Sequence, residues 1–99
     1  MTRKVYARIT WVLSDAGGRK KIPGGPIYSA PARFEDLEGR PLEEMWSVVI
    51  KLPTPNDSLS IITEMWLLSK NAPLELLHPG SLFDIYEGEK HVATGEVLP

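Results

Sequence analysis

The sequence predicts an all-β protein, a six-stranded antiparallel barrel that is closed or nearly closed and carries one short helix. Three observations indicate this fold. Apolar residues alternate with polar ones along several short segments, Gly and Pro stand between those segments, and the only helical candidate is very short. At 99 residues the chain is expected to form one domain, spanning residues 1–99. Closure would remove the exposed edges of the sheet.

The first two strands are expected at residues 4–14 and 27–34. In the first, one set of alternate side chains is apolar, and Tyr6 and Arg8 belong to the other set. In the second, Pro26 and Pro31 have no amide hydrogen to donate, which favours an edge position or an irregular path. The side chains expected to point inward from the first strand are Val5, Ala7, Ile9, Trp11 and Leu13.

A hairpin is expected next, from two alternating segments at residues 46–52 and 59–68. The stretch Pro-Thr-Pro-Asn-Asp at residues 53–57 interrupts the pattern between them. The expected inward side chains are Trp46, Val48, Ile50 and Leu52 on the first segment, and Leu59, Ile61, Thr63, Met65 and Leu67 on the second.

The helical candidate covers residues 72–77, with Asn71 as its cap, Pro73 in its first turn and Pro79-Gly80 after its end. Isolated helices below about 12 residues are marginal in water, so this one requires the barrel for support. We expect its leucines to close one end of the β-structure, the residues being Leu74, Leu76 and Leu77.

A second hairpin ends the domain, with strands at residues 82–86 and 91–98 around the turn Glu87-Gly88-Glu89-Lys90. The first and last strands are both expected inside the sheet. The predicted core includes Trp11, Trp46, Ile50 and Phe83.

Composition excludes several classes of protein. No apolar run approaches the roughly 20 residues that span a bilayer, and the first residues lack the apolar segment of a secretory leader. A cytoplasmic protein with no membrane association is therefore expected. The absence of Cys excludes disulfides and thiolate metal sites.

Residues 1–40 contain eight Lys or Arg against four acids, and residues 41–99 contain three against nine. This predicts a basic and an acidic face only if the two halves do not interleave.

Two stretches, residues 12–28 (VLSDAGGRKKIPGGPIY) and residues 78–99 (HPGSLFDIYEGEKHVATGEVLP), resemble the third domain of bacterial elongation factor Tu. In that family a Leu-Ser strand end precedes Gly-Gly-Arg, a Pro and a Tyr, and the closing hairpin has a Phe, a Glu-Gly turn and a basic residue. The resemblance implies a six-stranded barrel that helps to bind the T-stem of aminoacyl-tRNA and contacts a nucleotide-exchange factor. The RNA-binding positions it implies here are Gly17, Gly18, Arg19, Tyr28, Gly88 and Lys90. The glycine bends are expected to hold Arg19 on an exposed loop together with Lys20 and Lys21, which complete the predicted RNA-binding set.

This chain also departs from the family pattern. Ser29-Ala30-Pro31-Ala32 stands where the family has Arg-Pro-Gln, and Glu89 and His91 replace a Gly and a Thr beside the turn. Two polar side chains that face RNA are thereby absent, and an acid beside a phosphate repels it. The expected RNA contact is accordingly weak and electrostatic.

A protein-binding surface is the stronger expectation from the residues themselves. Side chains facing outward on residues 59–68 include aromatic and aliphatic groups, unless a loop covers them. Acids nearby would steer a basic partner, and a two-fold homodimer is the other possible use of such a surface. The predicted partner-binding residues are Ile62, Glu64, Trp66, Tyr86, Glu87 and Glu89.

No catalytic motif is present, so the chain is not expected to be an enzyme or to hold a cofactor or metal. There is no phosphate-binding GxxxxGK[ST], and His78 and His91 have no ligand spacing. Asp84, Glu87 and Glu89 are expected to be solvated carboxylates. The sequence therefore predicts a non-catalytic binding module of the elongation factor Tu barrel type that recognises a protein. The alternatives are an immunity or regulatory protein of a bacterial toxin system, and a tRNA-binding accessory of translation.

Overall fold

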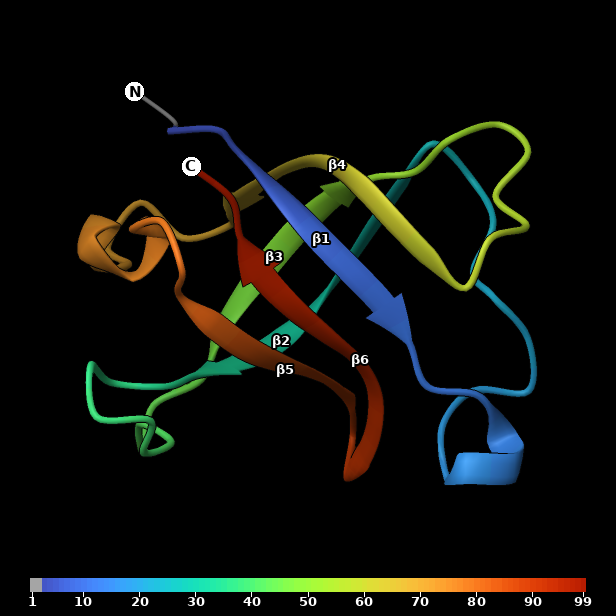
Figure 1. The fold of residues 1–99 in the computed structure, drawn as a ribbon, viewed down its shortest axis with the longest axis horizontal. Coiled ribbons are helices and arrows are strands. Elements are labelled where there is room, and N and C mark those ends of the chain that lie inside the picture. Colours follow the sequence, from blue (N-terminus) through green and yellow to red (C-terminus); the bar gives the residue numbers. More distant parts are fainter. Residues whose placement is uncertain (1–2) are drawn as a thin grey trace.

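The computed structural model describes residues 3–99, and it confirms the predicted closed, six-stranded antiparallel barrel (Figure 1). The first two residues, part of the segment predicted not to be a leader, lie outside the described residues. Around the barrel the strands follow the order β1-β4-β3-β2-β5-β6, and β6 pairs with β1 to close the ring. The strands are β1 (Val5–Trp11), β2 (Ile27–Phe34), β3 (Trp46–Lys51), β4 (Ser60–Leu67), β5 (Leu82–Glu87) and β6 (Lys90–Val97).

Antiparallel pairing sorts the connecting segments into two ends of the barrel. Residues 12–26, 52–59 and 88–89 connect strands at one end, which we call the β1–β2 loop end. Residues 35–45 and 68–81 connect strands at the other, the β2–β3 loop end (Figure 1). Residues far apart in the chain therefore meet at each end.

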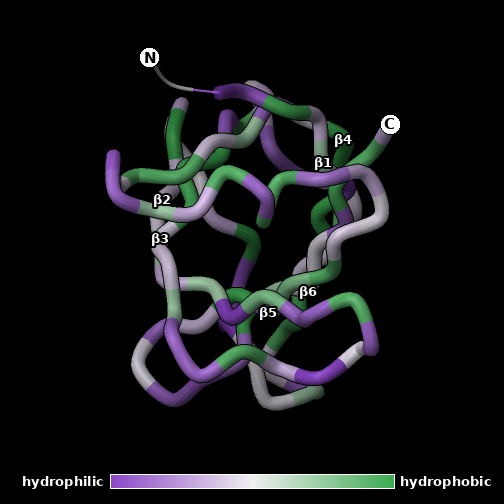
Figure 2. Tube along the Cα trace, turned by 90° about the vertical axis from the view of Figure 1, so that its left-hand side faces the viewer, coloured by the Kyte–Doolittle hydropathy of each residue, from purple (hydrophilic) through white to green (hydrophobic). Residues whose placement is uncertain are grey.

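The core lies inside the barrel and is formed mainly by the alternate side chains of the strands. Figure 2 shows hydrophobic and hydrophilic positions interspersed along the chain. Of the four predicted core residues, Trp11, Ile50 and Phe83 are buried and Trp46 is partly buried. The rings of Phe34 and Phe83 pack against each other with centroids 4.9 Å apart. Leu59 was predicted to point inward but is half-exposed, at the residue before β4 begins.

Strand β2 has neighbours on both sides in the ring, so it is not an edge strand along its whole length. Pro31 itself has a partner only on β3, so an edge position is found there locally. Residues 27–32 pair with β3, whereas pairing with β5 begins only at Ala32. Pro31 precedes the part of β2 that has neighbours on both sides. Its missing amide hydrogen is tolerated because at Pro31 the strand pairs with β3 alone.

The predicted helix at residues 72–77 is instead a 3₁₀ turn, η2 (Leu74–Leu77), and a second short 3₁₀ turn, η1 (Ser14–Ala16), follows β1. Only i→i+3 bonds fit between the two prolines, such as Leu76 N–H to the carbonyl of Pro73. Pro73 rather than Asn71 occupies the cap position. Leu76 and Leu77 are buried as expected, but Leu74 is half-exposed.

Gly95 on β6 lies directly opposite Phe83 on β5. A Cβ atom added at Gly95 would stand 2.2 Å from Cε2 of the Phe83 ring. The ring therefore occupies the space that any larger residue at position 95 would need. This contact joins the last two strands to the core.

We expect Phe83→Ala to lower the free energy of unfolding by about 3–5 kcal/mol, through lost burial and a cavity. Gly95→Ala should cost roughly 1–3 kcal/mol, because its methyl group collides with the ring. The double variant should lose less than the sum, since removing the ring makes room for the methyl group. Urea denaturation of wild type, the two single variants and the double variant measures these free energies of unfolding. Strictly additive effects, or an unchanged midpoint for Phe83→Ala, would contradict this packing.

Candidate functional site

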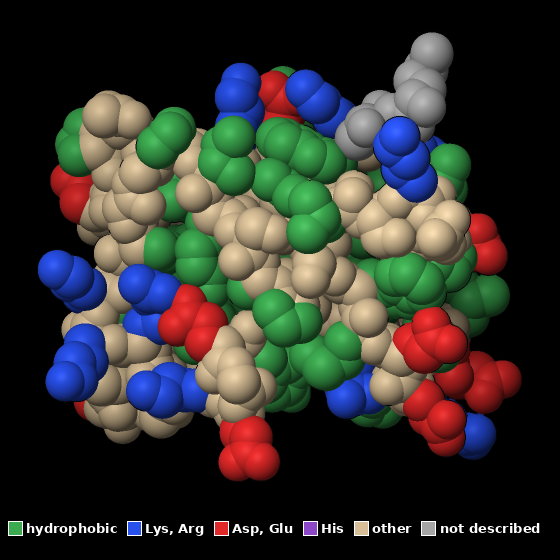
Figure 3. Space-filling model, turned by 180° about the vertical axis from the view of Figure 1, so that it is seen from behind, with side chains coloured by type: hydrophobic (Ala, Val, Ile, Leu, Met, Phe, Trp, Pro, Cys, Tyr) green, Lys and Arg blue, Asp and Glu red, His purple; other side chains and the backbone are tan. Residues whose placement is uncertain are grey.

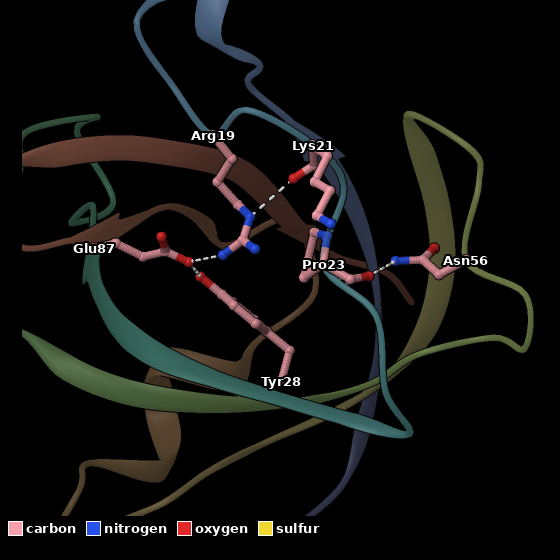
Figure 4. Close-up of polar contacts among 6 residues, drawn as sticks. All are labelled: Arg19, Lys21, Pro23, Tyr28, Asn56 and Glu87. Carbon is pink, nitrogen blue, oxygen red and sulfur yellow. Dashed lines mark hydrogen bonds and ion pairs between the residues drawn. The ribbon is translucent and has the colours of Figure 1, made fainter.

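A polar cluster of Arg19, Tyr28 and Glu87 lies at the β1–β2 loop end (Figure 4). Arg19 comes from the β1–β2 loop, Tyr28 from the start of β2 and Glu87 from the end of β5. The Glu87 carboxylate accepts hydrogen bonds from the Arg19 guanidinium and from the Tyr28 hydroxyl, and it forms an ion pair with Arg19. Three distant parts of the chain are thereby joined.

The bend at Gly17-Gly18 places Arg19 in this cluster. Gly17 ends η1 with a φ of 87°, a conformation that favours glycine. At Gly18 a Cβ atom would lie only 1.8 Å from the carbonyl oxygen of Val12. The backbone then returns to β1, where Arg19 N–H donates to the carbonyl of Val12 at 2.9 Å. The two glycines serve to fold the loop back.

Further contacts hold the β1–β2 loop against the barrel. Arg19 Nε donates to the carbonyl of Lys21 at 3.0 Å, and Asn56 Nδ2 donates to the carbonyl of Pro23 at 2.8 Å (Figure 4). The Arg19 guanidinium lies 5.7 Å from the centroid of the Tyr28 ring. Tyr28 in turn meets Trp11 edge to face, with centroids 5.4 Å apart. Arg19 is therefore a structural residue of this loop.

These contacts change the interpretation of the predicted RNA-binding set. Arg19 was expected to be held on an exposed loop, but its charge is balanced by Glu87 and its side chain is largely buried. Lys20, Lys21 and Lys90 remain exposed. Gly88 and Glu89 form the β5–β6 turn, where Gly88 has a φ of 64°. The cluster thus combines residues from the two separate sites that the sequence predicts.

A second candidate surface is the outer face of β1 and β4, which we call the β1–β4 face: Lys4, Tyr6, Arg8, Ile62, Glu64 and Trp66. In the register of these strands Tyr6 stands opposite Glu64, and Arg8 stands opposite Ile62. Tyr6 is 59% exposed and Ile62 is 60% exposed, whereas Trp66 is partly buried. The Lys4 ammonium lies over the Trp66 ring, 4.9 Å from its centroid.

Ion pairs border the β1–β4 face on both sides. Arg8 pairs with Glu96 of β6 at 3.2 Å, and Glu64 pairs with Lys51 of β3 at 3.6 Å. The apolar groups of Tyr6, Ile62 and Trp66 therefore lie between two partly exposed charged pairs. Tyr6 was not among the predicted site residues. Alternation already placed it on the outer face, but only the pairing of β1 with β4 shows that it neighbours Ile62.

Tyr86 does not belong to this face. It lies on β5, and β5 is three strands away from β4 in either direction around the ring. The expectation that Tyr86 joins Trp66 in one surface was therefore wrong, and Glu87 and Glu89 are separated from it as well. The Tyr86 ring packs against His91, with centroids 5.4 Å apart. His91 Nε2 lies 3.1 Å from Asp84 Oδ1, an ion-pair distance without hydrogen-bond geometry.

Within residues 3–99, no three His, Asp or Glu side chains gather closely enough to hold a metal ion. In the same part of the chain, no helix has the length and apolar character that crossing a membrane requires. Comparison with protein-family models and with curated protein sequences finds no match to this chain.

The Arg19–Tyr28–Glu87 cluster predicts that Tyr28 has a raised pKa. Burial raises the pKa of Tyr28 above its ordinary value of about 10, and the hydrogen bond and negative charge of Glu87 raise it further. Because the pKa of Tyr28 is higher in the folded state than in the unfolded state, its bound proton contributes fully to stability below the ordinary tyrosine pKa. That contribution is lost as pH rises from the ordinary pKa through the raised one. Alkaline titration of tyrosinate absorbance should show that Tyr28 ionises last, with Tyr28→Phe identifying its signal. Glu87→Gln should lower its pKa. An unchanged titration in that variant would argue against the hydrogen bond.

The three basic residues of the β1–β2 loop should differ in their effect on stability. Arg19→Ala should cost on the order of 1 kcal/mol, because it leaves Glu87 without its charged partner. The matched variants Lys20→Ala and Lys21→Ala should stay within about 0.5 kcal/mol of wild type, since both side chains are exposed. Thermal unfolding at neutral pH checks both expectations. Equal effects at all three positions would show that the Arg19 contacts do not stabilise the fold.

Proposed function

We propose that this barrel is a non-catalytic protein-binding module and that its binding surface is the β1–β4 face. The observation that supports the proposal is the exposure of Tyr6 and Ile62, which lie diagonally across from each other on the paired strands β1 and β4, with Trp66 further along β4. Large apolar groups together on a surface favour a macromolecular contact. Tyr and Trp are also enriched among the residues that contribute most to such contacts.

Closure of the barrel favours binding through side chains. Every strand has a neighbour on both sides in the ring, so little open sheet edge, such as residues 27–31 before pairing with β5 begins, is available for a partner to add a strand. The ion pairs beside the apolar groups resemble the polar rim of an interface. Such a rim contributes little affinity, because its charges remain near water, but it restricts how the partner is oriented.

The resemblance to the third domain of elongation factor Tu supports a stand-alone module of that barrel type. A shared barrel does not determine function, so the argument rests on the β1–β4 face. A tRNA-binding accessory has less support, because the ion pair with Glu87 leaves Lys20, Lys21 and Lys90 as the exposed cations of the predicted RNA-binding set.

An immunity or regulatory protein is a second form of the same proposal. It is favoured by the acidic β2–β3 loop, in which residues 35–45 include five acids and one Arg. Viewed from behind, the barrel has acidic side chains gathered near one end and basic ones near the other, with hydrophobic groups between them (Figure 3). A basic partner would be steered toward the acidic end.

Replacing Ile62 with Asp tests the β1–β4 face, because a charge at its centre opposes desolvation on binding. The matched control is Ile27→Asp, since Ile27 is also a strand isoleucine, is 54% exposed, and lies on β2, opposite β1 in the ring. Both variants should fold. A partner retained from native lysate by wild type and by Ile27→Asp should lose at least about tenfold in affinity for Ile62→Asp, equal to about 1.4 kcal/mol.

Sedimentation of the same three proteins separates a partner from a second copy of this chain. A dimer of wild type that Ile62→Asp dissociates would assign the face to self-association. A partner bound equally by both variants would place the binding surface elsewhere, and the proposal would then be wrong.

A further inference from the structure

Four side chains form a grid at the centre of the β1–β4 face, where strands β1 and β4 run side by side (Figure 1). Tyr6 stands opposite Glu64, and Arg8 stands opposite Ile62. Because alternate residues of a strand face the same side, all four side chains point outward. Tyr6 and Ile62 occupy one diagonal of the grid, the apolar diagonal, and Glu64 and Arg8 occupy the other, the charged diagonal. The face therefore carries opposite charges on the two sides of an apolar line.

Both ends of the charged diagonal can bind a further charge. The Arg8 side chain is 48% exposed and the Glu64 side chain is 30% exposed. Each pairs with one group on a neighbouring strand, Glu96 for Arg8 and Lys51 for Glu64. The bond to Glu96 uses one of the five N–H donors of the guanidinium. Exposed pairs of this kind contribute little to stability, so they leave both groups available to a binding partner.

A two-fold axis along the apolar diagonal makes the face complementary to itself. Rotation about this axis turns a second copy onto the face, with Tyr6 meeting Tyr6 and Ile62 meeting Ile62. The same rotation exchanges the corners of the charged diagonal, so Glu64 of each copy meets Arg8 of the other. With strands about 4.8 Å apart and alternate residues about 6.7 Å apart, the exchanged corners fall within roughly 3 Å of each other in projection. Both ion pairs are then within reach of the two side chains.

The other two-fold axes in the plane of the face do not give this match. An axis parallel to the strands sets Ile62 on Arg8, and an axis across the strands sets Ile62 on Glu64. An axis along the charged diagonal sets each charged group on the same group of the second copy. These arrangements bury a charge against an apolar group or against a like charge, and both are costly. The face is therefore complementary to a second copy in one orientation.

We propose that the β1–β4 face binds a second copy of this chain about this axis, an inference that rests on the proposed function of the face and names its partner. The contact is isologous, so each interaction occurs twice. The apolar diagonals pack at the centre, and the two ion pairs flank them. The border pairs extend these interactions, so that charges alternate in sign along each side in the order Lys51, Glu64, Arg8 of the second copy and Glu96 of the second copy.

Sedimentation velocity of wild type tests for the dimer. The grid is small and the barrel surface curves away from it, so a dissociation constant on the order of 100 µM is expected, weaker than that of a standard interface of about 1,600 Å². Concentrations from about a tenth of that value to about ten times that value should show a monomer converting to a dimer. Wild type that remains a monomer throughout would overturn the proposal.

Charge reversal tests the axis. Arg8→Glu and Glu64→Arg should each weaken the dimer at least about tenfold, because each variant brings like charges together twice. An equimolar mixture of the two variants should form a heterodimer, since one supplies only acids at the charged diagonal and the other supplies only bases. The double variant should dimerise again, because its charged diagonal has opposite signs once more. A mixture that remains monomeric would contradict the proposed pairing and overturn the inference.

Matched controls separate these contacts from the effect of net charge. Lys21→Glu and Glu38→Arg make the same changes in charge at exposed loop positions outside the face, and each should leave the dimer within about twofold of wild type. Equal weakening by these controls would overturn the axis. Should a reversed variant fail to fold, Arg8→Ala, Glu64→Ala and their combination measure the same pairing. Their effects on dimerisation should not add, and additive losses would overturn the proposal.

Ile62→Asp distinguishes this inference from the proposed function. A dimer that Ile62→Asp dissociates supports both. A monomeric wild type that retains a different protein from lysate, with loss of that protein in Ile62→Asp, overturns the inference of a second copy and supports the face as a binding surface for that protein. A dimer that neither Ile62→Asp nor the reversed variants weaken places self-association elsewhere on the barrel, and it overturns this inference.

Discussion

Pairing of β6 with β1 closes the sheet, and the other features of this molecule depend on that closure. In an open sheet, the first and last strands would expose unpaired backbone groups to solvent. Here every strand has two neighbours, so alternate side chains face a single enclosed core. The close contact between Phe83 and Gly95 fits β5 and β6 to that core. Stability comes from this packing, because the chain has no Cys to form disulfides.

Closure also gives the two ends of the barrel different chemistry. At the β1–β2 loop end, Glu87 balances Arg19, and the loop is bonded to the barrel. At the β2–β3 loop end, acids outnumber bases. Charge therefore differs between the two ends of the barrel, but this difference does not follow the two halves of the sequence, because Glu35, Asp36 and Glu38 of the acidic end belong to residues 1–40. The halves do not form two opposite faces either, because β1 and β2 lie on opposite sides of the ring.

Local pattern predicted most of the strands and the core, and it did less well wherever long-range contacts decided the outcome. Alternation has a period of two residues, so it identifies inward positions such as Ile9 and Ile50 without knowledge of the partner strand. It did not identify Leu59 as half-exposed, although the backbone of Leu59 still pairs with Trp11. The edge position predicted for β2 holds only locally, because Pro31 pairs with β3 alone and pairing with β5 begins at Ala32.

Local pattern is sufficient to predict an all-β chain, most of the inward-facing residues, the turns, and the outward positions of Tyr6, Ile62 and Trp66. These properties depend on neighbours within a few positions along the chain. Which strands are adjacent is known only from the folded barrel, because alternation does not specify a partner. The folded barrel placed Trp66 and Tyr86 apart, brought Arg19 to Glu87 across 68 positions, and set Arg8 diagonally across from Glu64. The physical reason is that closure joins distant segments through backbone pairing, which the side-chain pattern does not encode.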